Sequence, residues 1–132
     1  MTNKPFEGSS MWVWSAEGCW GKQPNSDPYR VRYFRRAFEV PNANCQLTVH
    51  VSADSRYVLW CNGIRVSRGP AKGDLTHHFY DTVDLTPYLR QGRNALAAQV
   101  VSFADSWPIL RYGGSPCSIM TAMGAFILDG DL

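Results

Sequence analysis

The stretch Cys45–Ala53, with the sequence CQLTVHVSA, carries the clearest β-strand pattern in the chain. Apolar residues occupy its odd-numbered positions from Leu47 to Ala53, and polar residues, His50 among them, occupy the even-numbered positions. Because successive side chains of a β-strand point to opposite faces, this alternation predicts a strand with one buried face. His50 is therefore expected to face solvent or a neighbouring strand.

The segments that follow predict a β-hairpin. An apolar segment, residues 57–61, and an alternating segment, residues 64–67, flank the pair Asn62-Gly63. These two residue types tolerate the positive φ angles that a two-residue type I′ turn requires. Residues 68–73 beyond the hairpin read as a surface loop.

Further short apolar or alternating segments, each bounded by Gly, Pro, Asn or Asp, predict strands over residues 11–15, 33–40, 79–83, 94–103 and 119–128. Residues 84–89 predict one helical turn, in which Pro87 suits the first position and Asp84 or Thr86 can cap. About eight strands at this spacing indicate an all-β fold, a two-sheet antiparallel jelly-roll sandwich.

The composition is that of a globular protein with one core. The chain has 132 residues, of which 45% are hydrophobic and 18% charged, and we expect a single domain over residues 1–132, structured from about residue 11 and flexible before it. The net charge is +2 and the basic residues form no run beyond Arg35-Arg36, so no nucleic-acid partner is expected. No stretch reaches the ~18 apolar residues of a membrane span and the first residues lack a secretory signal, so we expect no membrane partner and a cytoplasmic location.

Several motifs in order resemble one enzyme family. Residues 53–63 (ADSRYVLWCNG), 68–73 (RGPAKG) and 80–89 (YDTVDLTPYL) are similar to the N-terminal region of bacterial α-L-rhamnosidases of glycoside hydrolase family 78. Residues 12–15, 34–40 and 92–97 look like the same family. The resemblance runs from about residue 11 to the end and implies a galactose-binding-like jelly roll.

The resemblance also implies a function. Rhamnosidases carry catalysis on a separate α-helical barrel, and the sequence ends without one, so we expect a non-catalytic accessory domain. Such a domain would bind carbohydrate weakly, for example a rhamnose-containing glycan, or brace a glycosidase catalytic domain. The alternative is a purely structural protein–protein interaction domain without sugar binding.

The candidate catalytic and metal-binding residues have plainer explanations. Glycoside hydrolysis needs two carboxylates about 5 to 9 Å apart, whereas Asp54, Asp81 and Asp84 occupy turn positions with structural roles. Arg56 is expected to pair with Asp54 or Asp81. No catalytic residue is therefore assigned.

Metal and cofactor sites are likewise not expected. The adjacent His77 and His78 should point to opposite sides of a strand, one toward the core and one toward solvent. The four cysteines lack zinc-site spacing and are expected as free thiols, with Cys45 and Cys61 in strands. No cofactor is predicted. The resemblance leaves a structural calcium ion in a loop open, but no run of Asp and Asn at ligand spacing marks such a site and none is assigned.

Carbohydrate binding needs an exposed aromatic face and planar hydrogen-bonding groups. The loops at residues 17–22 and 103–114 offer both, and the candidate binding residues are Trp20, Asp105, Trp107, Arg111 and Tyr112. The open alternative is that Trp20 and Trp107 pack against the end of the sandwich or against a catalytic domain.

Overall fold

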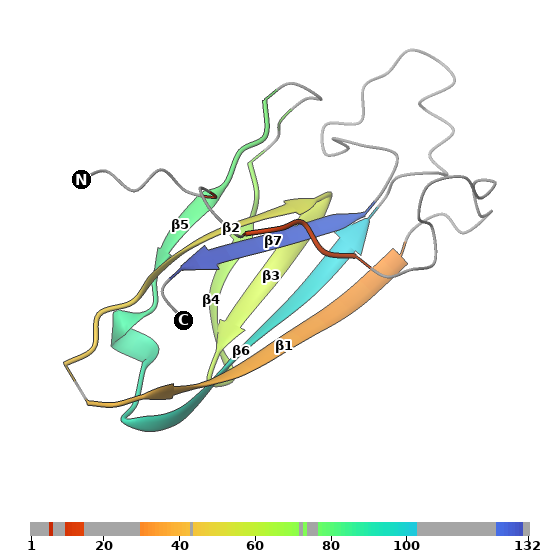
Figure 1. Ribbon diagram of the computed structural model, residues 1–132. Coiled ribbons are helices and arrows are strands. Elements are labelled where there is room, and N and C mark those ends of the chain that lie inside the picture. The colour runs from red at the N-terminus through yellow and green to blue at the C-terminus, as the bar shows by residue number, and fades with distance from the viewer. Residues whose placement is uncertain are drawn as a thin grey trace, which may run out of the picture.

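The computed structural model describes residues 6, 10–14, 30–42, 44–71, 73, 77–102 and 124–130. They form seven strands and one 3-10 helix (Figure 1): β1 Arg30–Val40, β2 Thr48–Asp54, β3 Arg56–Cys61, β4 Ile64–Gly69, β5 Asp81–Asp84, η1 Thr86–Tyr88, β6 Gly92–Ser102 and β7 Ala125–Gly130. One sheet has the order β1-β6-β3-β4 and the other β5-β2-β7, and all pairings are antiparallel. The predicted all-β sandwich is confirmed.

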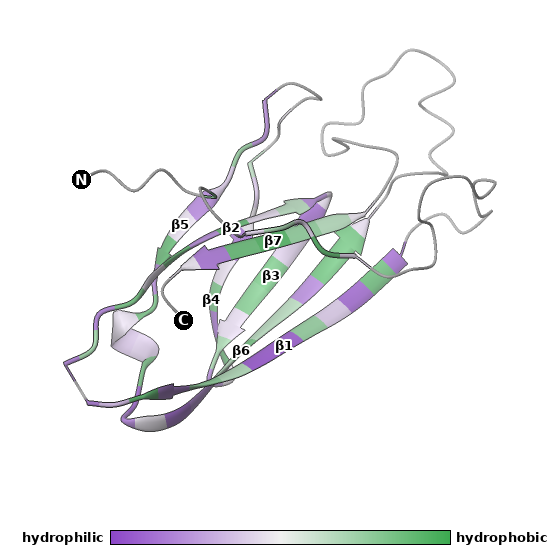
Figure 2. Ribbon diagram, in the orientation of Figure 1, coloured by the Kyte–Doolittle hydropathy of each residue, from purple (hydrophilic) through white to green (hydrophobic). Residues whose placement is uncertain are grey.

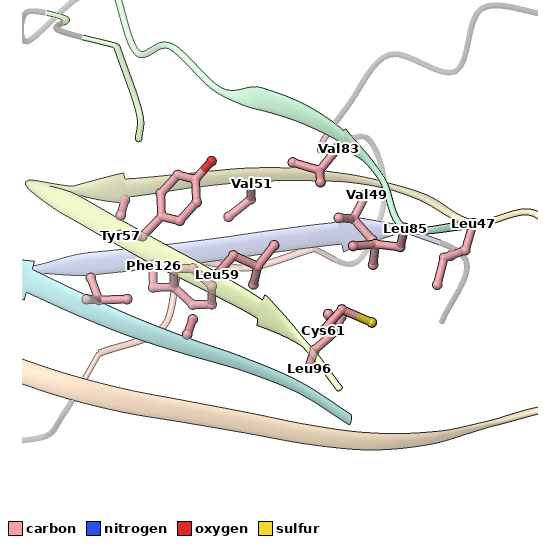
Figure 3. Packing of buried hydrophobic residues seen from close by; sticks show 13 residues of the cluster. Leu47, Val49, Val51, Tyr57, Leu59, Cys61, Val83, Leu85, Leu96 and Phe126 are labelled. Atoms are coloured by element: carbon pink, nitrogen blue, oxygen red, sulfur yellow. The ribbon is translucent and has the colours of Figure 1, made fainter. Parts of the chain in front are cut away.

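The core lies between the two sheets. Val49 and Val51 of β2 are fully buried, and Tyr57 and Leu59 of β3 are 2% and 1% exposed. Figure 3 shows these side chains pointing into one shared layer. The alternation in residues 45–53 therefore buries the residues it predicted.

Strand β1 is one of the two edge strands of the four-stranded sheet. Figure 2 shows hydrophilic and hydrophobic residues alternating along it. Phe34 and Phe38 pack against the core, and Phe34 stacks on Phe126 of β7 with ring centroids 5.0 Å apart. This aromatic contact joins the two sheets.

The predicted hairpin is confirmed. β3 pairs with β4 through Asn62 and Gly63, which have φ angles of 50° and 85°. The Asn62 side chain also accepts a hydrogen bond from Ala95 N and donates to Asn94 Oδ1 at 2.7 Å. The turn is thereby tied to β6.

Asn94 is the centre of a polar network at this end of the sandwich. Its side chain is 1% exposed, donates to the carbonyls of Arg90 and Gly92, and accepts from Arg90 N and Asn62 Nδ2. A buried amide with all these partners satisfied stabilises the corner instead of destabilising it.

The predicted helical turn is present as η1, with Pro87 near its start. Leu85 occupies the N-cap position and no side chain caps η1, so the predicted capping by Asp84 or Thr86 is wrong. Asp84 Oδ1 instead accepts a hydrogen bond from Thr86 N at 2.9 Å in the turn that precedes η1. The Thr86 hydroxyl and amide hold the pKa of the Asp84 carboxyl below its usual range. Thr86 Oγ1 in turn accepts from Leu47 N, which attaches the helical turn to the residue before β2.

Several strand boundaries differ from the prediction. β2 begins at Thr48, so Cys45 does not lie in a strand as expected. The chain is still turning at Cys45, because Asn42 accepts hydrogen bonds from both Asn44 N and Cys45 N. Cys61 does lie in β3, and both thiols are free.

Two other predicted strands are shorter than expected within the described residues. β5 begins at Asp81, and Phe79 and Tyr80 precede it as exposed residues. In the segment 10–14, Val13 alone pairs, through a bridge to Phe126 that places this segment beside β7. No helix in the described part of the chain has the length and apolarity needed to cross a membrane.

Candidate functional site

The four-stranded sheet presents a broad outward surface, which we call the outer face. Strand pairing arranges its side chains in rows across the sheet: Tyr33, Gln99, Val58 and Arg68 form one row, and Arg35, Ala97, Trp60 and Arg65 form the next. Val101 and Arg56 stand beside the first row, and none of these side chains is buried. Because the opposite positions of the same strands fill the core, strand alternation fixes this surface.

A pocket of about 530 Å³ opens at one end of the outer face. Its lining residues are Arg56, Tyr57, Val58, Arg68, Gly69, Gln99 and Val101. The two valines give apolar surface, whereas the two guanidinium groups and the Gln99 amide give planar hydrogen-bonding groups. This mixture suits a ligand with both apolar and hydroxyl faces.

An exposed aromatic ring stands beside the pocket. Tyr33 is 75% exposed, and its hydroxyl accepts a hydrogen bond from Gln99 Nε2 at 2.9 Å. This bond orients both the phenol and the amide on the outer face. Tyr33 and Gln99 together meet the two requirements of a sugar-binding surface that the sequence assigned to the loops.

The strand beneath the pocket is fixed by a buried hydrogen-bond network. The Tyr57 hydroxyl donates to Asp81 Oδ2 at 2.5 Å and is 2.9 Å from Ser67 Oγ. Burial and the bond to Asp81 raise the pKa of Tyr57 above its ordinary value. The network links β3 and β4 of one sheet to β5 of the other. The Asp81 carboxylate is thus bonded to Tyr57.

Gly69 is required for this close packing. A Cβ atom at Gly69 would lie 2.0 Å from Asp81 Oδ2 and 3.2 Å from Tyr57 Cε1. The β4 strand end therefore approaches the Tyr57–Asp81 pair in a way that only glycine permits. Since Gly69 also lines the pocket, the pocket's shape depends on this contact.

The outward surface of the three-stranded sheet, unlike the outer face, carries a carboxylate and a histidine that both bond to neighbouring residues. Asp129 of β7 accepts hydrogen bonds from Ser10 Oγ and from Phe6 N, which hold its pKa below the usual range. His50 bonds across the strands to Thr82, as its position in the alternation predicted. The rings of His50 and Phe6 both make edge contacts with the ring of Tyr80.

The five predicted binding residues lie outside the described residues. They are Trp20, Asp105, Trp107, Arg111 and Tyr112, and their assignment stays a prediction. The described residues that flank their two segments do meet, because Arg30 and Ser102 pair at one end of the β1–β6 ladder. Val101, which lines the pocket, belongs to this end of β6.

The prediction for the two adjacent histidines is wrong. His77 and His78 are both exposed and precede β5 outside any strand, so strand alternation does not apply to them. His78 makes an edge contact with the Trp12 ring at 6.1 Å. Among the described residues no group of three or more His, Cys, Asp or Glu side chains could hold a metal ion.

The described carboxylates do not converge on the pocket. Asp54 is buried, Asp81 is bonded to Tyr57, and Asp84 accepts a hydrogen bond from Thr86 N. The pocket is lined without any acidic residue. Asp81 lies in β5 and bonds to Tyr57, so its predicted turn position is wrong, whereas Asp84 bonds to Thr86 beside the helical turn.

The outer face was missed at the sequence level. The alternation that placed Phe34 and Phe38 inside also placed Tyr33 and Arg35 outside, so the signal was present within β1. The pairing of Tyr33 with Gln99, 66 positions away, needed the sheet order.

The comparisons with known proteins agree with the motifs. The chain is 31% identical to an α-L-rhamnosidase of Streptomyces avermitilis over 98 aligned residues, which make up 74% of this chain. Its fold matches the crystal structure of a family 78 rhamnosidase of Bacillus sp. GL1 with a TM-score of 0.69 and 32% identity over 94% of the chain. This sandwich matches a domain of α-L-rhamnosidases.

A further solved rhamnosidase shares the fold of the sandwich. The S. avermitilis α-L-rhamnosidase complexed with L-rhamnose matches over 90% of this chain with a TM-score of 0.55 at 24% identity. The rhamnosidase-like sandwich spans only 9% to 12% of the length of these three relatives. No family model matches the chain.

Proposed function

We propose that this chain is a non-catalytic accessory domain of a rhamnosidase-like glycoside hydrolase, and that it binds carbohydrate weakly on its outer face. The observation that supports sugar binding is the pocket beside the Tyr33–Gln99 pair. A sugar ring has an apolar C–H face that packs on an aromatic ring, and hydroxyls that bond to amide and guanidinium groups.

The expected affinity is low because the site is open to water. An exposed tyrosine and a shallow pocket bury little of a ligand, so a dissociation constant of about 1 mM, near −4 kcal/mol, is reasonable. L-Rhamnose and rhamnose-containing oligosaccharides are the first ligands to test, since the relatives of known activity are rhamnosidases.

The test is a titration by calorimetry and thermal unfolding. At ligand concentrations about ten times the dissociation constant, binding adds about 1.4 kcal/mol of stability. Tyr33→Ala should abolish this stabilisation, whereas Tyr80→Ala, an exposed tyrosine outside the pocket, should preserve it. Absence of any saturable heat or stabilisation with every saccharide would refute carbohydrate binding.

Bracing of a catalytic domain is the second candidate function. It is favoured by exposed apolar side chains in the segment 10–14 and before β5: Met11 is 76% exposed, Val13 44%, Trp12 43%, Phe79 49% and Tyr80 43%. Contiguous exposed apolar surface commonly marks an interface. The occupant we propose is the catalytic domain, because the relatives are far longer than this chain.

Docking is testable with a relative that lacks its matching domain. The remainder of the Bacillus sp. GL1 enzyme should bind this chain in calorimetry, and Trp12→Ser should weaken the complex. Tyr33→Ser, which alters a tyrosine of the outer face, is the control. Equal weakening by both variants, or no complex, would contradict docking through this surface.

A further inference from the structure

Folding separates the charges of this chain onto two sheets. Strands β1, β3, β4 and β6 contain eight arginines and one acidic residue, Glu39: the arginines are Arg30, Arg32, Arg35, Arg36, Arg56, Arg65, Arg68 and Arg93. Strands β2, β5 and β7 contain four aspartates and neither lysine nor arginine. A net charge of only +2 conceals this asymmetry.

Arginines border the outer face on both edges. Arg35 of β1 lies at one end of its row and Arg65 of β4 at the other, separated by Ala97 and Trp60. Three strand spacings of about 4.8 Å put their Cα atoms about 14 Å apart. Arg68 ends the adjacent row, about 7 Å along the strands. The guanidinium groups thus flank a central strip of apolar and aromatic side chains.

Three of these arginines are exposed and carry no ion pair to a described residue. They are Arg35, Arg65 and Arg68. The strands of this sheet contain one carboxylate, that of Glu39. It lies opposite Arg93, four residues along β1 from Arg35 and therefore two rows away. Like charges held on one surface repel one another, and they favour an anion that bridges them. The outer face is therefore matched to a ligand with repeated negative charge.

The acidic sheet of a second copy does not suit this role. Asp54 is buried, Asp81 is bonded to Tyr57, Asp84 accepts a hydrogen bond from Thr86 N, and Asp129 accepts from Ser10 and Phe6. These carboxylates already have partners within the chain. An anionic ligand from outside the protein is the better match.

We propose that the outer face binds a polysaccharide that contains uronic acids, with Arg35 on one edge and Arg65 and Arg68 on the other as the carboxylate contacts. The inference rests on the proposed carbohydrate-binding function and names its ligand class. A guanidinium group bonds a carboxylate through two parallel N–H donors, which lysine cannot reproduce. Between the edges, Trp60, Val58 and Tyr33 offer surface to the sugar rings.

The probe is polygalacturonate, compared with neutral dextran and with dextran sulfate, by affinity electrophoresis and calorimetry on the whole chain. Polygalacturonate should bind at least tenfold more tightly than dextran, and its affinity should fall at least tenfold between about 20 mM and about 500 mM NaCl because exposed ion pairs are screened. Each of Arg35→Gln, Arg65→Gln and Arg68→Gln should weaken binding up to about fivefold, which corresponds to about 1 kcal/mol.

Arg36→Gln is the matched control. It removes the same charge from an exposed side chain one position along β1, which the register places opposite Leu96 and therefore on the other face of the sheet. It should leave polygalacturonate affinity within a factor of two. Equal weakening by Arg35→Gln and Arg36→Gln would mean that only net charge matters, and it would overturn the assigned contacts.

The remaining outcomes separate this inference from the proposed function. If dextran or rhamnose oligosaccharides bind as tightly as polygalacturonate and without salt dependence, the uronate inference fails and carbohydrate binding stands. If dextran sulfate or a DNA oligonucleotide binds as tightly as polygalacturonate, the face is a general polyanion surface and the inference is likewise overturned. If no saccharide binds, both fail.

Discussion

Replacing Tyr57 with phenylalanine tests the network beneath the pocket. The substitution keeps the ring, so it creates no large cavity, and it removes the hydroxyl that bonds to Asp81 at 2.5 Å and to Ser67 at 2.9 Å. A hydrogen bond to a charged group contributes about 1.5 to 3 kcal/mol. Because Asp81 is half-buried and regains some water, we expect a loss of about 2 kcal/mol in the free energy of unfolding.

The expected loss in the free energy of unfolding corresponds to a shift in the melting temperature, Tm. For 132 residues the entropy of unfolding is about 280 cal/mol/K, so 2 kcal/mol lowers Tm by about 7 °C. Tyr33→Phe is the matched control, because it removes the same atom from a residue that is 75% exposed and should shift Tm by less than about 2 °C. Differential scanning calorimetry measures both, and equal shifts in the two variants would refute the reasoning.

The same residue predicts an alkaline dependence. The pKa of Tyr57 is raised in the folded chain, so its contribution to stability is fully present below the ordinary tyrosine pKa of about 10 and is lost as the pH rises above it. The parent chain should therefore lose more stability than Tyr57→Phe between about pH 9.5 and 11. A larger alkaline loss in the variant would contradict the assignment.

Gly69, Asn94 and Asp129 each make a contact whose loss should be measurable. Gly69→Ala should lower the free energy of unfolding measured in urea titrations by about 2 kcal/mol, because the added Cβ meets the Asp81 carboxylate. The same substitution should cost less in a Tyr57→Phe background, where Asp81 has lost its bond to the Tyr57 hydroxyl. Additive losses in the double variant would contradict the shared network. Asn94→Asp removes the two amide donors to the carbonyls of Arg90 and Gly92 and should lower the free energy of unfolding by about 2 to 4 kcal/mol in the same assay. A loss below about 0.5 kcal/mol would show that this network does not stabilise the corner. Because the pKa of Asp129 is depressed in the folded chain, its contribution to stability is present above about pH 4 and is lost as the pH falls. The free energy of unfolding of Asp129→Asn should therefore fall less steeply with decreasing pH than that of the parent chain. An equal pH dependence in the two proteins would contradict this role of Asp129.

The sandwich could be predicted from the sequence because its signals are local. Alternation in residues 45–53 and the Asn62-Gly63 pair depend only on neighbouring residues, and both are confirmed. Strand ends were less accurate because they depend on turn contacts, as at Asn42, and on pairing partners far away in the chain. The two histidines before β5 were misassigned for the same reason, since alternation applies only where a strand exists.

The outer face could not be predicted because it combines residues from four strands. The basic residues looked dispersed along the chain, and only the order β1-β6-β3-β4 gathers Arg35, Arg65 and Arg68 around Trp60. A strand register converts separations of thirty or more residues into one row. The binding residues predicted in the two loops lie outside the described residues and remain a second location for the ligand.

The measurement that tests the outer face most directly is a map of amide chemical shifts in the ¹⁵N-labelled chain titrated with L-rhamnose oligosaccharides and with oligogalacturonate. Saturable shifts should concentrate on Tyr33, Val58, Gln99 and Arg68, with little change in β2, β5 and β7. Shifts confined to the loop segments 17–22 and 103–114, or to the three-stranded sheet, would contradict it.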